Sequence, residues 1–140
     1  MDIVYSYFVM DILHRGHLLM LKNSKSIAGE NGRLIVGIVS DEAVVIKKGR
    51  APILSFPERL ELAQSIKYVD LVVEQKEYLP FENIKSIRPT ILMESDSHDT
   101  RAIKEAQRVM EKIGGKVIVM PYFQGQSSTQ IKKKISSTSK

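Results

Sequence analysis

Short apolar runs alternate with helix-like segments along the whole chain. Five runs are rich in β-branched residues and nearly continuous in apolar character, which is typical of strands covered on both faces. These runs are residues 3–9, 33–39, 70–74, 90–94 and 116–120. The segments between them have helical periodicity: Leu18, Leu21 and Ala28, for example, fall on one face of residues 17–28.

Start and stop signals frame the other helices. Ser55, Pro57 and Glu58 form the pattern of an N-cap, a first-turn proline and a capping box. The remaining helices are predicted at residues 55–66, 80–87, 101–113 and from 127 or 128 to 135. Strands alternating with helices predict an α/β fold: a Rossmann-like, doubly wound sheet of five parallel strands flanked by helices. We expect one domain over residues 1–135 and a frayed tail at 136–140.

Composition narrows the functional classes. The chain has 140 residues and no cysteine, which excludes disulfides, thiolate nucleophiles and cysteine-ligated metals. No apolar run approaches the roughly 18 residues of a membrane span, and the first residues lack a basic leader pattern. A cytoplasmic setting is therefore expected.

Positive charge is concentrated toward the C-terminus. Residues 101–140 hold nine Lys and Arg against two Glu, whereas the first hundred hold twelve against fourteen Asp and Glu. A basic segment attracts polyanions, including nucleotides and nucleic acid, but it is also typical of solvated helix faces. Nucleic-acid binding is the weaker hypothesis, because Tyr122 and Phe123 are the only aromatic residues there and no nucleic-acid motif is present.

Two of the three histidines flank a glycine where the first strand gives way to the first helix. His14, Gly16 and His17 fall at the carboxyl end of that strand, where open α/β sheets bind ligands. The backbone N–H groups of a helix N-terminus suit a phosphate, and glycine allows close approach. Two imidazoles there can stabilise a phosphoryl-transfer transition state. Three alternatives stay open: a metal site with Asp11 as third ligand, a general base, and a structural role.

Three motifs in sequence order carry a resemblance to a known family. "DILHRGH" resembles the H-x-G-H signature of the nucleotidyltransferase superfamily, especially the cytidylyltransferases of the glycerol-3-phosphate type. Residues 36–73 resemble that family's second strand, basic loop, E-Q-R helix and Y-V-D segment, and "QGQSSTQIKKKI" resembles its closing E-G-I-S-T-T-x-I motif. Sugar-phosphate adenylyltransferases share the first and last of these motifs.

The resemblance implies a reaction. A phosphate or phosphonate oxygen of a small acceptor attacks the α-phosphorus of a nucleoside triphosphate, and pyrophosphate leaves. Cytidylyl transfer is the favoured form of this reaction, and Mg²⁺ accompanies the triphosphate. CTP or ATP and a small phosphorylated substrate are the implied partners, and the family implies a homodimer. By resemblance, His14, His17 and Lys47 are catalytic. The implied nucleotide- and phosphate-binding residues are Asp11, Gly16, Lys48 (in a flexible basic loop with Lys47), Arg59, Asp96, Ser127, Ser128 and Thr129.

The chain departs from the family pattern at several positions. Phe8 replaces a glycine, Glu94 stands where a Gly-Asp-Asp-Trp segment should begin, and Tyr122 replaces an arginine. These changes fall where base, ribose and acceptor should bind, so a non-catalytic nucleotide-binding domain is an alternative function. His98 is either part of the second-substrate pocket or a polar residue beside a helix cap formed by Asp99 or Ser97.

Overall fold

The computed structural model describes residues 1–121 and 128–138, and in the last helix the side chains of residues 131–137. In this part of the chain the strands are β1 (Ile3–Phe8), β2 (Arg33–Val39), β3 (Leu71–Gln75), β4 (Ile91–Ser95) and β5 (Lys116–Met120). The helices are α1 (Arg15–Ala28), α2 (Asp41–Lys48), α3 (Phe56–Gln64), α4 (Phe81–Ile87), α5 (Thr100–Lys112) and α6 (Ser128–Thr138). Among the described residues, no helix combines the length and apolar character needed to span a bilayer.

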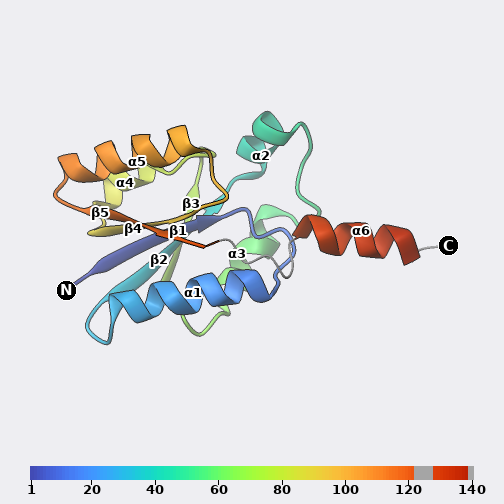
Figure 1. Ribbon diagram of the computed structural model, residues 1–140. Coiled ribbons are helices and arrows are strands. Elements are labelled where there is room, and N and C mark those ends of the chain that lie inside the picture. Colours follow the sequence, from blue (N-terminus) through green and yellow to red (C-terminus); the bar gives the residue numbers. More distant parts are fainter. Residues whose placement is uncertain (122–127, 139–140) are drawn as a thin grey trace.

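The strands form one parallel sheet in the order β3-β2-β1-β4-β5. Helices α1 and α3 cover one face of the sheet, and α4 and α5 cover the other (Figure 1). The predicted fold class is therefore confirmed. Strands β2 and β3 lie on one side of β1, and β4 and β5 lie on the other. The loops that follow β1 and β4 therefore lead to opposite sides at the carboxyl ends of the strands, which opens a crevice between them.

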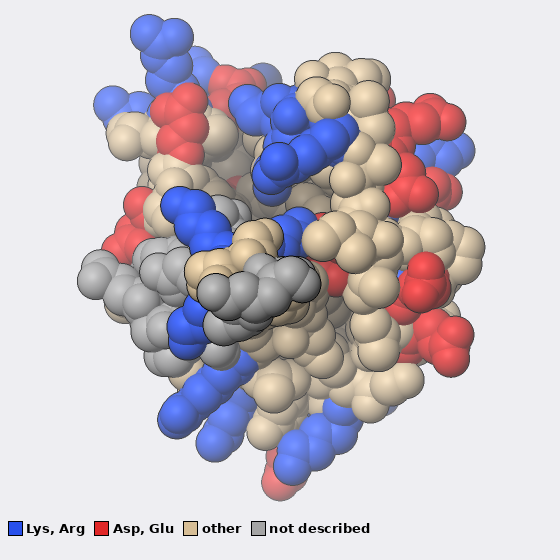
Figure 2. All heavy atoms as spheres, turned by 90° about the vertical axis from the view of Figure 1, so that its right-hand side faces the viewer, with Lys and Arg blue, Asp and Glu red and all other residues tan. Residues whose placement is uncertain are grey.

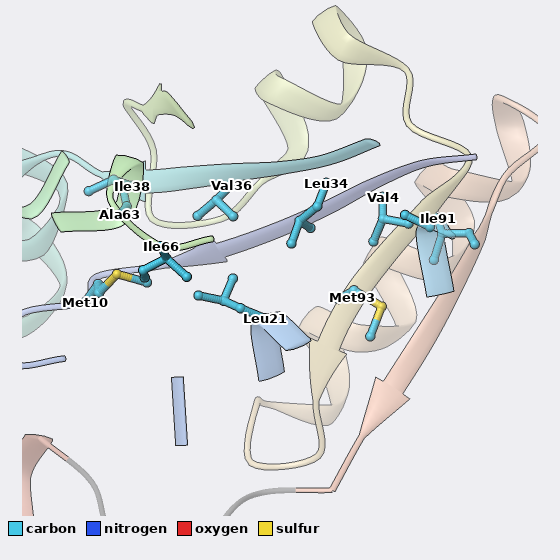
Figure 3. Packing of buried hydrophobic residues seen from close by; sticks show 11 residues of the cluster. Val4, Met10, Leu21, Leu34, Val36, Ile38, Ala63, Ile66, Ile91 and Met93 are labelled. Atoms are coloured by element: carbon cyan, nitrogen blue, oxygen red, sulfur yellow. The ribbon is translucent and has the colours of Figure 1, made fainter. Parts of the chain in front are cut away.

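Side-chain alternation along β1 divides the core into two layers. Val4 points toward the α1 and α3 side, where it packs with Leu21, Leu34 and Met93 (Figure 3). Tyr5 points to the opposite side, into a cluster with residues of α4 and α5. Because both faces are covered, the strands need apolar residues at nearly every position, which explains the continuous apolar runs in the sequence.

Helix α2 corrects the prediction of a flexible loop around Lys47 and Lys48, since both lysines lie in its last turn. The Ser40 side chain accepts a hydrogen bond from the Ala43 backbone N–H and caps the helix. Gly49 ends it with a φ of 78°, a left-handed conformation that favours glycine. The two lysines at the C-terminal end of α2 also complement the helix dipole. Their side chains therefore project from a helix and not from a flexible loop.

Helix α6 differs from the expected C-terminal boundary. It continues to Thr138, past Ile135, where the predicted domain ended and a frayed tail began. In Figure 1 it extends away from the sheet on the side of the strands' carboxyl ends. Lys132, in its second turn, forms an ion pair with Asp11 in the turn after β1, with the two side-chain atoms 2.5 Å apart.

Candidate active site

The loops that follow β1 and β4 border a hollow at the carboxyl ends of the strands. Figure 2 views this side of the molecule and shows the hollow with Lys and Arg side chains on its rim. The hollow comprises two adjoining cavities of about 690 and 490 Å³. The residues that line both are Tyr7, Phe8, His14, His17, Ser97 and His98. The region around the predicted histidine pair is therefore the junction between the two cavities.

The two cavities differ in charge. The larger cavity is lined by the cationic side chains of Lys47, Lys48, Arg50 and Lys132. The described lining of the smaller cavity contains no Lys, Arg, Asp or Glu, and three methionines, Met20, Met93 and Met120, contribute to it. The larger cavity is therefore suited to phosphate groups, and the smaller one to a weakly polar group.

The sequence around the histidines builds the start of α1. His14 is the N-cap residue, and its Nδ1 accepts a hydrogen bond from the Gly16 backbone N–H at 3.0 Å. The Nδ1 of His17 in turn accepts from the His14 backbone N–H at 3.2 Å, which completes a reciprocal capping box. Because each Nδ1 is an acceptor, the proton of each neutral ring must reside on Nε2. Both rings therefore offer an Nε2–H donor to the cavities they line.

Burial keeps these rings neutral. It lowers the pKa of His14, and together with the neighbouring His14 ring it lowers the pKa of His17 to about 4. The ring centroids are only 4.0 Å apart, so two charged imidazoles would repel each other strongly. At neutral pH the pair supplies hydrogen-bond donors, and the cavity's positive charge comes from the lysine and arginine side chains.

The low pKa of His17 predicts a pH-dependent stability. The unfolded chain binds a proton at His17 near its ordinary pKa of 6.5, but the folded chain does so only near 4. Stability is therefore full above about pH 6.5 and falls as the pH drops toward about 4, by about 3 kcal/mol over this window. Urea unfolding at a series of pH values measures the loss. His17→Asn is the control that should flatten the curve, and an equally steep curve for this variant would assign the loss to other groups.

Comparison with known proteins decides the family. A family model described as cytidylyltransferase-like matches residues 9–139, which covers nearly the whole chain and both loops that border the junction. The chain belongs to the cytidylyltransferase-like family. This membership confirms the resemblance inferred from the sequence, and the family consists of nucleotidyltransferase enzymes.

Two relatives of this cytidylyltransferase-like chain carry different names. The FAD synthase of Pyrococcus abyssi is 38% identical over 120 residues, covering 82% of this chain and 77% of the relative. The Bifunctional protein HldE of Hydrogenovibrio crunogenus is 34% identical over 134 residues. That match covers 95% of this chain but only 27% of the relative, so the chain spans about a quarter of HldE.

A solved structure agrees with the fold of this family member. The lipopolysaccharide core biosynthesis protein from Thermoplasma volcanium superposes with a TM-score of 0.71 at 28% sequence identity. The superposition covers 90% of this chain and 99% of that protein. The parallel sheet and its flanking helices are thus shared along almost the full length of both chains.

Asp11 lies in the larger cavity of this cytidylyltransferase-like fold, where it joins three segments. Its carboxylate accepts hydrogen bonds from the backbone N–H groups of Ile53 and Leu54 at 3.0 and 2.8 Å, and it pairs with Lys132. Burial raises the pKa of this carboxyl, but the Lys132 and backbone contacts outweigh it and hold the pKa below its usual value. The interactions connect the turn after β1, the segment before α3, and α6.

Arg59 does not line either cavity, although the resemblance implied that it binds an anion. Its side chain is fully buried, and its Nη1 donates to the carbonyl oxygens of Val9 and Val39 at 2.7 and 2.8 Å. Nε donates to the Leu54 carbonyl, and Nη2 pairs with Asp41 at 2.6 Å. The guanidinium is thus directed toward the ends of β1 and β2, where it holds the backbone that forms the cavity wall.

The other predicted residues divide into two groups. Gly16 lines the smaller cavity, whereas Asp96 lines neither cavity. The backbone N–H of Asp96 donates to the Met120 carbonyl. Ser127 and Tyr122 lie outside the described residues. Ser128 and Thr129 begin α6, but their side chains also lie outside the described part, so their predicted phosphate contacts stay predictions.

Phe8, at the position of a family glycine, leaves both cavities open. Its ring meets the His17 ring edge-on, with centroids 5.7 Å apart, and packs against the core on the α1 side. Sequence reasoning missed Tyr7, Tyr78 and Lys132 as lining residues of the larger cavity. For Lys132 a signal existed, because it follows the S-S-T segment by one helical turn.

Proposed function

We propose that this chain transfers a nucleotidyl group, cytidylyl in first place, from a nucleoside triphosphate to a small phosphorylated alcohol or phosphonate. The proposal rests on the junction, at His14 and His17, of a cationic cavity with one whose described lining has no Lys, Arg, Asp or Glu. A group exchanged between two bound substrates must be reachable from both binding sites, and the α-phosphoryl group meets that requirement at the junction. The nucleoside then occupies the smaller cavity, and the acceptor phosphate and leaving pyrophosphate occupy the larger one.

The reaction needs no covalent enzyme intermediate. An acceptor phosphate oxygen forms a bond to the α-phosphorus, the bond to the β-bridging oxygen breaks, and pyrophosphate leaves with that electron pair. The Nε2–H donors of His14 and His17 bind the oxygens on which charge develops. Lys47 and Lys48 balance the charge of the phosphates from α2. Catalysis then rests on positioning and charge stabilisation.

Mg²⁺ fits this scheme as the ion that arrives with the triphosphate. Among the described residues, no group of three His, Cys, Asp or Glu side chains is placed to hold a metal ion. Phosphate oxygens and water are the ligands that Mg²⁺ prefers when the protein offers few. The ion supplies charge neutralisation on the triphosphate, while the side chains of Lys47 and Lys48 orient the phosphate groups.

Adenylyl transfer is the second candidate. It is favoured by the two FAD synthases that are 36% and 38% identical, because FAD contains an adenylyl group. Cytidylyl transfer is favoured by the Y-V-D segment at residues 68–70. A homodimer and a cytoplasmic setting also stay predictions.

Calorimetric titration with Mg²⁺–CTP and with Mg²⁺–ATP is the decisive experiment. Binding of one nucleotide selects the branch, and pyrophosphate release is then measured with glycerol 3-phosphate, FMN and a sugar 1-phosphate as acceptors. Binding without pyrophosphate release from any acceptor would favour a non-catalytic nucleotide-binding domain. Binding of neither nucleotide would reject the proposal.

Lys47 gives a graded test of the same model. Its Nζ lies 5.8 Å from the centroid of the Tyr78 ring, and both residues line the larger cavity. Lys47→Ala should raise the KM for the nucleotide roughly tenfold to hundredfold, since one charged hydrogen bond is lost. Lys104→Ala, on the exposed face of α5, is the matched control that should leave KM unchanged. An unchanged KM for Lys47→Ala would remove this lysine from the binding site.

A further inference from the structure

All three histidines of the chain line both cavities, although they come from different loops. His14 and His17 follow β1, whereas His98 follows β4. These two strands are neighbours at the switch point of the strand order. A group placed at the junction of the cavities is therefore bordered by imidazoles from both loops. The motif accounts for the first two histidines but not for His98.

A buried carboxylate holds His98 in place. Glu94, at the end of β4, is only 1% exposed, and its carboxylate contacts Nδ1 of His98 through a short hydrogen bond. The same carboxylate accepts hydrogen bonds from the Tyr7 hydroxyl at 2.8 and 3.0 Å. The Tyr7 and His98 rings also lie against each other, with centroids 5.8 Å apart. We call these three side chains the Tyr7–Glu94–His98 cluster.

Structural needs explain this cluster only in part. Burying a carboxylate is costly unless hydrogen bonds compensate, and Tyr7 and His98 supply them here. A helix cap is not the reason for His98, because the Asp99 side chain caps α5 by accepting from the Arg101 backbone N–H. The contact with Glu94 uses one ring nitrogen, Nδ1, and the half-exposed residue lines both cavities, so Nε2 is the ring nitrogen left for a ligand.

We propose that His98 is a third phosphate-contacting histidine that acts in its doubly protonated form: Nδ1–H donates to Glu94, Nε2–H donates to a phosphoryl oxygen at the junction, and Glu94 and Tyr7 are its positioning residues. The inference rests on the proposed nucleotidyl transfer. The oxygen belongs either to the α-phosphate of the nucleotide or to the phosphate of the acceptor, since both meet at this place. Glu94, which stands where the family has glycine, is thereby part of an altered site and not a sign of its loss.

Histidine NMR tests the contact directly, because the chain has only three imidazoles and single variants assign their C–H resonances. The folded wild-type protein is titrated with Mg²⁺–CTP, with Mg²⁺–ATP, and with glycerol 3-phosphate. A His98 shift with a nucleotide assigns the α-phosphate, and a shift with glycerol 3-phosphate alone assigns the acceptor phosphate. Shifts of His14 and His17 with a nucleotide, while His98 responds to no titrant, would overturn the inference and leave the proposed function standing. A nucleotide that moves none of the three would overturn both.

Two substitutions at His98 separate ligand contact from structural support. His98→Asn keeps a donor for Glu94 near the position of Nδ1 but removes Nε2, whereas His98→Gln places its amide near Nε2. If Nε2 binds phosphate, His98→Asn lowers kcat/KM roughly tenfold to hundredfold at unchanged thermal stability, and His98→Gln retains more of it. Equal activity of His98→Asn and the wild type would limit His98 to supporting Glu94.

Glu94→Gln tests the positioning role through a spectroscopic signature. The glutamine side chain keeps the shape and still accepts from Tyr7, but its amide donates to Nδ1 where the carboxylate accepted. His98 is then expected to lose its Nδ1 proton and keep Nε2–H in a neutral ring, which ¹⁵N shifts report. An unchanged His98 protonation pattern in Glu94→Gln would show that Glu94 does not orient this ring.

Discussion

His17→Ala should reduce nucleotidyl transfer by roughly two to three orders of magnitude, the effect of removing one preorganised donor from a developing oxyanion. The Nδ1 of His17 is bound to the His14 backbone, so Nε2–H is the donor left for a ligand in the cavities that this residue lines. Alanine removes that donor, and because it also removes the acceptor that His17 gives the capping box, we expect a stability loss of about 1 kcal/mol. Steady-state pyrophosphate release and urea unfolding measure the two effects.

His17→Asn separates the catalytic role from the capping role. The asparagine side-chain oxygen can accept the hydrogen bond from the His14 backbone N–H, as Nδ1 does, but nothing replaces Nε2–H. Its activity should therefore be as low as that of the alanine variant, while its stability at neutral pH stays close to that of the wild type. Substantial activity in His17→Asn would mean that the ring serves the helix cap alone.

The sequence was sufficient to predict the histidine pair and its setting. A strand-like run followed by His14, Gly16 and His17 and then a helical pattern places both rings at a strand-to-helix turn. Each of these signals is local, because the capping box spans only three residues. Ser40, which caps α2, and Gly49, which ends it, are local signals of the same kind, whereas the family resemblance places Lys47 and Lys48 in a loop.

Interactions distant in sequence could not be predicted in this way. The partners of the Arg59 guanidinium include Val9, fifty positions earlier in the chain, and Val39 on another strand. Glu94 and Tyr7 become neighbours because β1 and β4 pair in the sheet. Periodicity does not specify which strands pair, so neither the burial of Arg59 nor the surroundings of Glu94 could be predicted from single-sequence patterns.

Arg59→Met is expected to destabilise the fold by about 3–5 kcal/mol, the usual cost of removing one partner from a buried, hydrogen-bonded charge. Methionine fills a similar volume, but the carbonyl groups of Val9, Val39 and Leu54 lose their donor. At this chain length such a loss lowers the Tm by on the order of 10 °C. Thermal and urea unfolding, with Arg108→Met on the exposed face of α5 as control, measure the effect.

The same variant separates the structural role of Arg59 from the anion-binding role that the family resemblance implied. If Arg59 supports the backbone at the ends of β1 and β2, stability falls, and nucleotide affinity measured at a temperature where the variant is folded falls less. If its guanidinium contacts the triphosphate, affinity drops roughly tenfold to hundredfold while the Tm stays near the wild-type value. The structure favours the first result, because the side chain is fully buried and lines neither cavity. A stable variant with weakened nucleotide binding would require the guanidinium to leave its backbone partners when the nucleotide binds.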